Sequence, residues 1–377
     1  MFHLWILLPA LYVCFRFVFP LKRPLSLKIF ISLVVIAGCE FHLISRFVYG
    51  SMFSPELPYP LMILIGWFFG ATIFFALFLL IIDFVQFLLK VFMRRHFTDL
   101  QPLKVVALTV GCIFSAMGIW GGIKVPEVKR LEITVKNLPP AFDGFTVVQL
   151  TDLHASRLLS RHWITSVVDR TNKLNADLIT LTGDMADGTV EARREDVSPL
   201  ASLHAKYGIW AITGNHEYYF NAPDLIKEYQ HMGINFLLNK HVILHKDGSS
   251  LVLAGVNDEA ATQYGQVGPS ITGALQGIPK NMPILLLDHR PGNANENAAK
   301  DVGLQLSGHT HGGMITGLDI LARPANNGFV SGLYSVNGMS LYVSNGTGIW
   351  NGFPLRIGQS SEITLITLRS PTSNPYR

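Results

Sequence analysis

Histidine, aspartate and asparagine residues follow short apolar runs from residue 152 onward in this 377-residue chain. The runs predict buried strands, because they are brief and are bounded by glycine or polar residues. The residues that follow them are Asp152, His154, Asp184, Asn215, His216, His289, His309 and His311. Since α/β proteins bind ligands where strands end, these side chains are expected to meet at one sheet edge. Imidazole and carboxylate groups at such an edge would bind zinc, manganese or iron.

The predicted donors exceed the needs of a single metal ion. A tetrahedral site uses about three or four protein ligands. The candidates are Asp152, His154, Asp184, Asn215, His289, His309 and His311. Two ions that share one carboxylate would use the whole set, and Asp184 suits the shared position because it stands alone after its run. Two such ions, about 3.5–4 Å apart, form a clamp for in-line displacement at phosphorus.

The polar blocks come in a fixed order along the chain: Asp-Leu-His at 152–154, Gly-Asp at 183–184, Gly-Asn-His-Glu at 214–217, His289, and Gly-His-Thr-His at 308–311. This ordered set resembles the calcineurin-like metallophosphoesterase family over nearly all of 145–368. The Leu-Asp-His-Arg-Pro block at 287–291 and the strand end at 342–346 are similar to the membrane-anchored branch of that family. The resemblance implies an α/β (α+β) sandwich of four layers, with two mixed β-sheets flanked by helices.

The resemblance also implies a role for each polar residue. The first metal would take Asp152, His154, Asp184 and His311, and the second would take Asp184, Asn215, His289 and His309. His216 would be an imidazole that binds no metal and acts as general acid, while metal-activated water attacks phosphorus. Glu217 would either orient His216 or cap the following helix. Manganese, iron and zinc all suit this ligand set.

The region from about 125 onward predicts the elements that position these residues. Expected strands cover 129–136, 145–150, 177–182, 208–213, 234–238, 241–245, 251–256, 283–287, 304–306, 340–345 and 362–368. Expected helices cover 160–174, 191–206 and 293–300, and a further helix begins near 222. Strands and helices alternate at first and consecutive strands follow, which is typical of two sheets packed face to face with helices outside.

The first third of the chain is predicted to lie in a membrane. Hydrophobic residues make up 49% of the chain and charged residues 15%, against roughly 25% charged residues in a soluble domain. A membrane-spanning helix needs about 20 apolar residues, and the apolar runs lie at 4–20, 25–44, 61–89 and 103–123. We therefore expect a membrane domain at 1–124, with about four spans, and a metallophosphoesterase domain at 125–377. The first run contains Pro9 and is marginal, so whether it spans stays open.

The charges that flank these runs predict an orientation. Basic residues gather in two loops, at Arg16, Lys22, Arg23 and Lys28 and at Lys90, Arg94, Arg95 and Lys104. The loop between them offers Arg46, which Glu56 offsets. Because cytoplasmic loops are enriched in lysine and arginine, the catalytic domain is expected on the outer, non-cytoplasmic side. Polar residues also lie within or near the ends of the predicted spans, and they are expected to be functional groups or interfacial side chains; these are Glu40, His42, Asp83 and Gln86.

These features predict a membrane-anchored phosphodiesterase or pyrophosphatase. The expected partners are the lipid bilayer and a phosphorylated substrate of membrane origin, such as a phospholipid, a lipid-linked sugar phosphate or an envelope polymer. One alternative is a UDP-diacylglucosamine-type pyrophosphatase of lipid A synthesis, which needs a cytoplasmic domain. Another is a membrane sensor or scaffold that binds a phosphorylated ligand without turnover. The net charge of +4 and the absence of a basic stripe give no indication of nucleic-acid binding.

Two further features leave alternatives open. Arg290 directly follows His289, and its guanidinium is expected to contact substrate phosphate or to form an ion pair. Trp350 and Phe353, at the end of a glycine-rich loop, are expected to touch acyl chains or to pack locally. The sequence does not indicate an oligomeric state.

Overall fold

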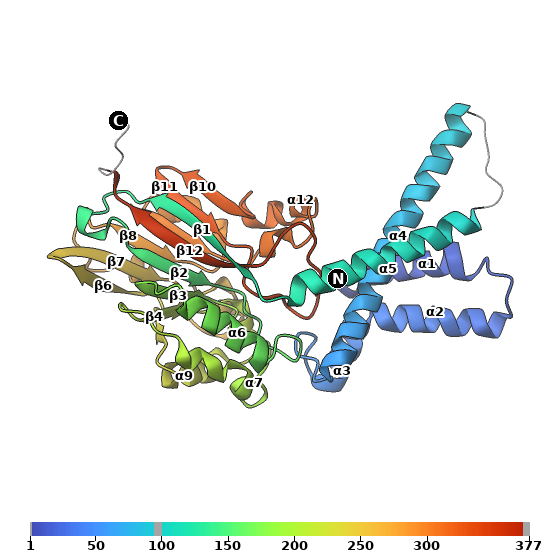
Figure 1. Cartoon of the computed structure of the whole chain (residues 1–377), viewed down its shortest axis with the longest axis horizontal. Helices are drawn as coiled ribbons and strands as arrows, with labels where there is room; N and C mark the ends of the chain where they lie inside the picture. The colour runs from blue at the N-terminus through green and yellow to red at the C-terminus, as the bar shows by residue number, and fades with distance from the viewer. Residues whose placement is uncertain (1, 94–99, 372–377) are drawn as a thin grey trace. The chain divides into compact units, whose positions relative to one another are not determined.

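A computed structural model describes residues 2–93 and 100–371 of the chain (Figure 1). Arg94 and Arg95, which contribute to the predicted orientation, lie outside the described residues. The chain divides into two compact units. The helical unit contains Met1–Gly122 and Asn351–Arg356, and the sandwich unit contains Ile123–Trp350 and Ile357–Arg377.

The helical unit is built from apolar helices. These are α1 (Phe2–Val13) with a π-helical turn η1 (Cys14–Val18), α2 (Leu25–Cys39), α3 (Phe41–Tyr49), α4 (Tyr59–Met93) and α5 (Gln101–Ile123). By length and composition, α4 and α5 can each cross a membrane, and α2 with α3 adds a third crossing if that bent pair forms one span. The described residues therefore give two or three spans, where the sequence predicts about four.

The difference arises at the first two apolar runs. The run at 25–44 is interrupted after Cys39, where α2 and α3 meet at an angle of 66°. The first run forms a shorter apolar helix, His3–Val18. Asp83 on α4 accepts a hydrogen bond from Arg16 Nε at 2.7 Å. This pairing lowers the cost of placing either charge in an apolar unit.

The first sheet of the sandwich unit has the order β1-β12-β2-β3-β4-β5. Its strands are β1 (Glu127–Thr134), β2 (Thr146–Leu150), β3 (Leu178–Thr182), β4 (Ile209–Ile212), β5 (Asn235–Phe236) and β12 (Glu362–Arg369). Strands β2 to β5 run parallel, and β12 is antiparallel to β2. Figure 1 shows helices beside this sheet, namely α6 (Arg161–Asn172), α7 (Val190–Val197) and α9 (Ala222–His231).

The second sheet has the order β10-β11-β9-β8-β7-β6. Its strands are β6 (Lys240–Lys246), β7 (Ser249–Gly255), β8 (Ile284–Leu287), β9 (Leu304–Ser307), β10 (Gly332–Val336) and β11 (Met339–Val343). The four central strands are parallel, and each edge strand is antiparallel to its neighbour. The short helices α10 (Ile271–Ala274) and α11 (Ala294–Ala298) belong to the same region.

Alternating side chains of the second sheet serve two different cores. Leu251 and Leu253 join a core that also holds Val147 and Ile366 of the first sheet. Val252 lies in a separate core with Ile271 and Ala274 of α10, because successive side chains on a strand point to opposite faces. The sheets therefore pack face to face and helices cover the outside. The predicted fold, an N-terminal helical region followed by a sandwich of two mixed sheets, is confirmed.

Several element bounds differ from the sequence prediction. Strand β10 was not predicted, and β5 contains only Asn235–Phe236 where 234–238 was expected. The helix expected at 191–206 ends at Val197 and continues as a 3-10 turn, Ser198–Ser202. These segments are short or lie at sheet edges, where local sequence gives the weakest signal. The strands that precede the polar blocks match their predicted positions closely.

Candidate metal centre

The strands of both sheets deliver the polar blocks to one place. β2 and β3 end two residues before Asp152 and Asp184, and β4 ends three residues before Asn215, while β8 and β9 end two residues before His289 and His309. Donor atoms within 4.8 Å of one another form three groups, namely Asp152 with His154 and His311, His154 with Asp184 and His216, and Asp184 with His289 and His309. The groups overlap through Asp184 and His154.

The donor atoms inside these groups lie close to one another. Nε2 of His154 lies 3.2 Å from Nε2 of His311, which in turn is 3.5 Å from Asp152 Oδ1. Nε2 of His289 lies 3.3 Å from Asp184 Oδ2. Two imidazole nitrogens that face each other need a shared proton or a cation between them.

Hydrogen bonds outside the groups fix how the imidazoles point. Nδ1 of His289 donates to the carbonyl oxygen of Thr182 at 2.7 Å, which leaves Nε2 directed at Asp184. Nδ1 of His154 lies 2.9 Å from Asp187 Oδ1, and its Nε2 likewise faces the groups. Histidine ligands of metals commonly use the second nitrogen in this way.

Asp187 is a residue of this site that the sequence prediction missed. Its Oδ1 atom also accepts from Nδ1 of His216 at 2.6 Å, so one buried carboxylate holds two imidazoles. The signal in the sequence was a second aspartate three positions after Asp184, in Asp184-Met185-Ala186-Asp187. It was overlooked because Asp187 follows no strand directly.

The side chains of Asn215 and Glu217, both in the Gly-Asn-His-Glu block, differ in their contacts. Asn215 Oδ1 is buried with no hydrogen-bond partner among the described residues, which is costly unless something else satisfies it. The Glu217 carboxylate accepts from the backbone N–H groups of Gly214 (2.7 Å), Asp184 (2.9 Å) and Met185 (2.8 Å). Glu217 therefore caps the helical turn α8 (Asn215–Tyr219) and ties the loops after β3 and β4 together.

Many of these residues adopt a left-handed backbone. The φ angles lie between 47° and 69° for Asp152, His154, Asp184, His309 and His311. Residues other than glycine rarely adopt this conformation, and it is found mainly where a functional site requires it. Positive φ also occurs at other non-glycine residues of the chain, mostly asparagines such as Asn137 and Asn175, and asparagine adopts this conformation more readily than most residues.

Glycines in the same blocks permit close approach of neighbouring loops. A Cβ on Gly214 would lie 2.2 Å from Asp184 Oδ1, and one on Gly308 would lie 2.3 Å from Asp152 Oδ2. The Cβ on Gly214 would also lie 2.7 Å from the Asp184 backbone nitrogen, and that on Gly308 would lie 2.2 Å from Thr151 Oγ1, so neither position accepts a side chain unless its neighbours move. The glycines therefore belong to the site as spacers.

The pKa values of the site residues shift in different directions: burial raises the pKa of Asp152 and lowers that of His309, whereas charged neighbours outweigh burial at Asp184 and His216. Burial alone raises the pKa of Asp184, but the imidazoles of His289 and His216 outweigh it and hold that pKa well below its usual range. Burial lowers the pKa of His216, yet Asp184 and Asp187 raise it to about 9. The two carboxylates therefore favour the protonated form of the His216 imidazole.

These observations fit a pair of divalent cations. The donor set combines imidazoles, carboxylates and a neutral amide, which suits manganese, iron or zinc. The facing nitrogens of His154 and His311 and the unpartnered Oδ1 of Asn215 are directed at positions that a cation would satisfy. The residues present therefore match a dimetal site.

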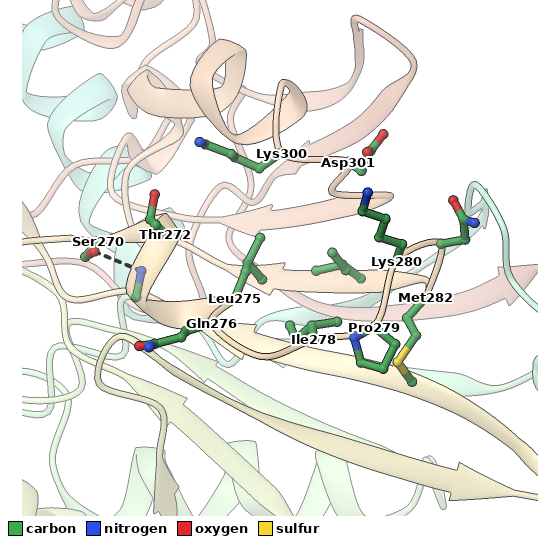
Figure 2. A pocket seen from close by; sticks show the side chains of 13 residues that line it. Ser270, Thr272, Leu275, Gln276, Ile278, Pro279, Lys280, Met282, Lys300 and Asp301 are labelled. Carbon is green, nitrogen blue, oxygen red and sulfur yellow. Dashed lines mark hydrogen bonds between the residues drawn. The ribbon is translucent and has the colours of Figure 1, made fainter.

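Two other features of the sandwich unit lie outside the three donor groups. Arg290 donates from Nε to Asp258 Oδ2 at 2.8 Å, so the ion-pair alternative describes this arginine. A cavity of about 820 Å³ also opens in the sandwich unit (Figure 2). Within the described residues its walls come from other parts of the chain, including Leu275, Lys280, Met282 and Lys300. It is separate from the site of the polar blocks.

A mixed double-sheet sandwich whose strand ends gather histidines and aspartates defines a metal-dependent phosphoesterase class. The calcineurin-like phosphoesterase family model matches residues 145–313. A transmembrane protein with metallophosphoesterase domain from Danio rerio is 35% identical over 70% of this chain and 62% of its own length. The uncharacterized metallophosphoesterase YkuE of Bacillus subtilis is 31% identical over 70% of this chain and 94% of its own. A further uncharacterized metallophosphoesterase, Cj0846 of Campylobacter jejuni, is 30% identical over 76% of both chains.

The chain belongs to the calcineurin-like metallophosphoesterase family. This chain covers 62% of the length of the Danio rerio relative, which is less than two thirds of that protein.

Proposed function

We propose that this protein is a membrane-anchored dimetal phosphoesterase that hydrolyses a phosphodiester or pyrophosphate bond. The observation that carries the proposal is the convergence of buried histidine and aspartate donors on Asp184 and His154. Two bound cations would neutralise phosphoryl oxygens and make water a stronger nucleophile.

The proposed ligands divide into two sets that share Asp184. Asp152, His154, Asp184 and His311 would hold one ion, and Asp184, Asn215, His289 and His309 would hold the other. Asn215 contributes no charge, so the site keeps a net positive charge when it is loaded. That charge attracts a phosphate group.

His216 is proposed as the general acid. Its Nδ1 is engaged by Asp187, which leaves Nε2 available to protonate the leaving oxygen. Asp187 stabilises the protonated imidazole and fixes its orientation. The same carboxylate orients His154, so it links the proton donor to the metal ligands.

Hydrolysis of a simple diester tests this proposal. The purified full-length protein is expected to hydrolyse bis-p-nitrophenyl phosphate when Mn²⁺ is added. Asp184→Ala and Asn215→Ala are expected to abolish turnover, because each removes a proposed ligand. Full activity in either variant would contradict the dimetal mechanism, and retained phosphate binding without turnover in the wild-type protein would favour a sensor.

We further propose that the substrate is membrane-associated and that the sandwich unit lies on the outer side. The apolar helices keep the site near a bilayer, and the distribution of basic residues among the loops supports this orientation. A screen of phospholipids, lipid-linked sugar phosphates and nucleotide pyrophosphates, with Mn²⁺, Fe²⁺ and Zn²⁺ tested separately, would identify the substrate class and the metal.

A further inference from the structure

Tyr219 ends the helical turn that begins with the proposed metal ligand Asn215. This turn, α8, is five residues long. Residues four apart lie on the same side of a helix, so the Tyr219 side chain can reach back to Asn215. Asn215 Nδ2 donates to the Tyr219 hydroxyl oxygen at 3.3 Å. The nitrogen end of this amide is therefore held from within its own turn.

The two ends of the Asn215 amide have different surroundings. The nitrogen has Tyr219 as its partner, whereas Oδ1 is buried with no hydrogen-bond partner among the described residues. The residue is only 5% exposed, and an acceptor left unpaired at such depth is costly. An amide oxygen binds a cation, but the NH2 group offers only donors. Which end of the amide faces the site therefore matters for metal binding.

The Tyr219 ring contacts two other aromatic rings of the sandwich unit. Its centroid lies 5.0 Å from that of His216 and 6.1 Å from that of Tyr264. Tyr264 ends a 3-10 turn whose Ala261 shares a small apolar cluster with Tyr218 of α8. These contacts restrain the ring, and the position of the ring sets that of its hydroxyl group.

This 3-10 turn, η4 (Glu259–Tyr264), is tied to the loop of a second proposed ligand. The carboxylate of Asp258, only 2% exposed, accepts from a backbone N–H group of the turn at 2.8 Å and from Arg290 Nε at 2.8 Å. Arg290 directly follows His289, which is proposed to bind the same ion as Asn215. The loops of these two proposed ligands are thus connected through η4.

We propose that Tyr219 is a positioning residue that holds the Asn215 amide with its oxygen toward the metal ion. The hydroxyl group engages the nitrogen end, and the oxygen end is left to coordinate. Without this bond the amide can rotate and present its NH2 group to the site. The inference rests on the dimetal function proposed above, and it assigns Tyr219 to the ion that Asn215 and His289 would share.

Tyr219→Phe in the full-length protein tests the role of the hydroxyl group, because phenylalanine keeps the ring beside His216. The affinity for one of two Mn²⁺ ions is expected to fall about tenfold, the lower end of the range for residues that orient metal ligands, since a hydrogen bond of 3.3 Å is long. The other ion is expected to bind as in the wild-type protein, and turnover at saturating Mn²⁺ should stay near the wild-type value. Electron paramagnetic resonance during a Mn²⁺ titration distinguishes a single ion from a spin-coupled pair, and diester hydrolysis is measured in parallel.

Tyr218→Phe is the matched control, because it removes a hydroxyl group from the preceding residue of the same turn. That hydroxyl lies 2.9 Å from Thr213 Oγ1, so its loss disturbs the turn and leaves the bond between Asn215 and Tyr219 intact. Mn²⁺ affinity is expected to stay at the wild-type value. Equal losses in Tyr218→Phe and Tyr219→Phe would show a general disturbance of the turn and would overturn the inference.

Asn215→Asp provides a second test, because both ends of a carboxylate are oxygen atoms and neither has to be selected. In this background, adding Tyr219→Phe is expected to cause no further loss of Mn²⁺ affinity. An equal loss in both backgrounds would overturn the inference, as would wild-type affinity in the single Tyr219→Phe variant. A wild-type protein that binds no pair of Mn²⁺ ions would overturn the dimetal function, and this inference with it.

Discussion

At the scale of single residues, Asp187 organises the chemistry of the site. It lies between His154, a proposed ligand, and His216, the proposed proton donor, and one oxygen accepts from both. Glu217 does not contact the His216 ring in these bonds and serves the backbone instead. Under the proposed function, adjacent residues of this block would serve protonation, metal coordination and loop structure separately.

Substitution of His216 separates proton transfer from metal binding. His216→Asn is expected to keep the full metal content while turnover falls by about 10²–10⁴, the range for general acid–base catalysis. Metal analysis together with steady-state kinetics measures both quantities. Loss of metal in this variant would make His216 a ligand and redraw the assignment.

Substitution of Asp187 should change the pH dependence of turnover. The protonated form of His216 exists below its raised pKa and is lost as pH rises through it. Asp187→Asn removes a carboxylate that raises this pKa, so the alkaline loss of activity is expected to begin at a pH lower by about one unit or more. The profile of kcat against pH at saturating Mn²⁺ measures the shift.

Asp169→Asn on the exposed face of α6 provides the control for charge removal. Its profile is expected to match the wild-type profile. If Asp187→Asn and Asp169→Asn give the same alkaline limb, Asp187 does not act through His216.

At the scale of elements, the strands place the proposed ligands, and the glycines set how closely the loops approach one another. β2, β3 and β4 bring their loops to one edge of the first sheet, and β8 and β9 bring theirs from the second. Gly214 then lets the loop after β4 contact Asp184 directly. Loop spacing, as well as ligand identity, therefore determines the site.

A methyl group at Gly214 should disturb this spacing. Gly214→Ala is expected to destabilise the protein by about 1–3 kcal/mol, as overpacking does in tight sites, and to weaken Mn²⁺ binding. Thermal unfolding and metal titration measure the two effects. Gly292→Ala, whose nearest contact would be 3.9 Å away, should change stability by less than about 0.5 kcal/mol, and equal effects would refute the steric argument.

At the scale of the whole molecule, apolar helices accompany a phosphoesterase sandwich in one chain. The helical unit holds its own charged residues in pairs, such as Arg16 with Asp83. It also holds Asn351–Arg356, a segment far from the helices in sequence. The apolar helices are the reason for proposing a substrate that resides at the bilayer.

Reporter fusions test the proposed orientation. A reporter after residue 377 is expected to be active only on the outer side, and one inserted after Met93 only in the cytoplasm, because the basic loops should stay inside. Activity assays of both fusions in intact cells measure this. A cytoplasmic C-terminus would reverse the orientation and favour a cytoplasmic nucleotide pyrophosphate as substrate.

The sequence by itself determined the family, the sandwich and the strand ends, because apolar runs and motif blocks are local signals. Six residues of the observed donor groups were predicted as metal ligands from the sequence, namely Asp152, His154, Asp184, His289, His309 and His311. The tertiary structure decided what depends on long-range packing. It placed Asp187 between two imidazoles, bent the run at 25–44, and seated Asn351–Arg356 among helices. Local periodicity carries no information about such contacts, since the partners lie tens to hundreds of residues apart.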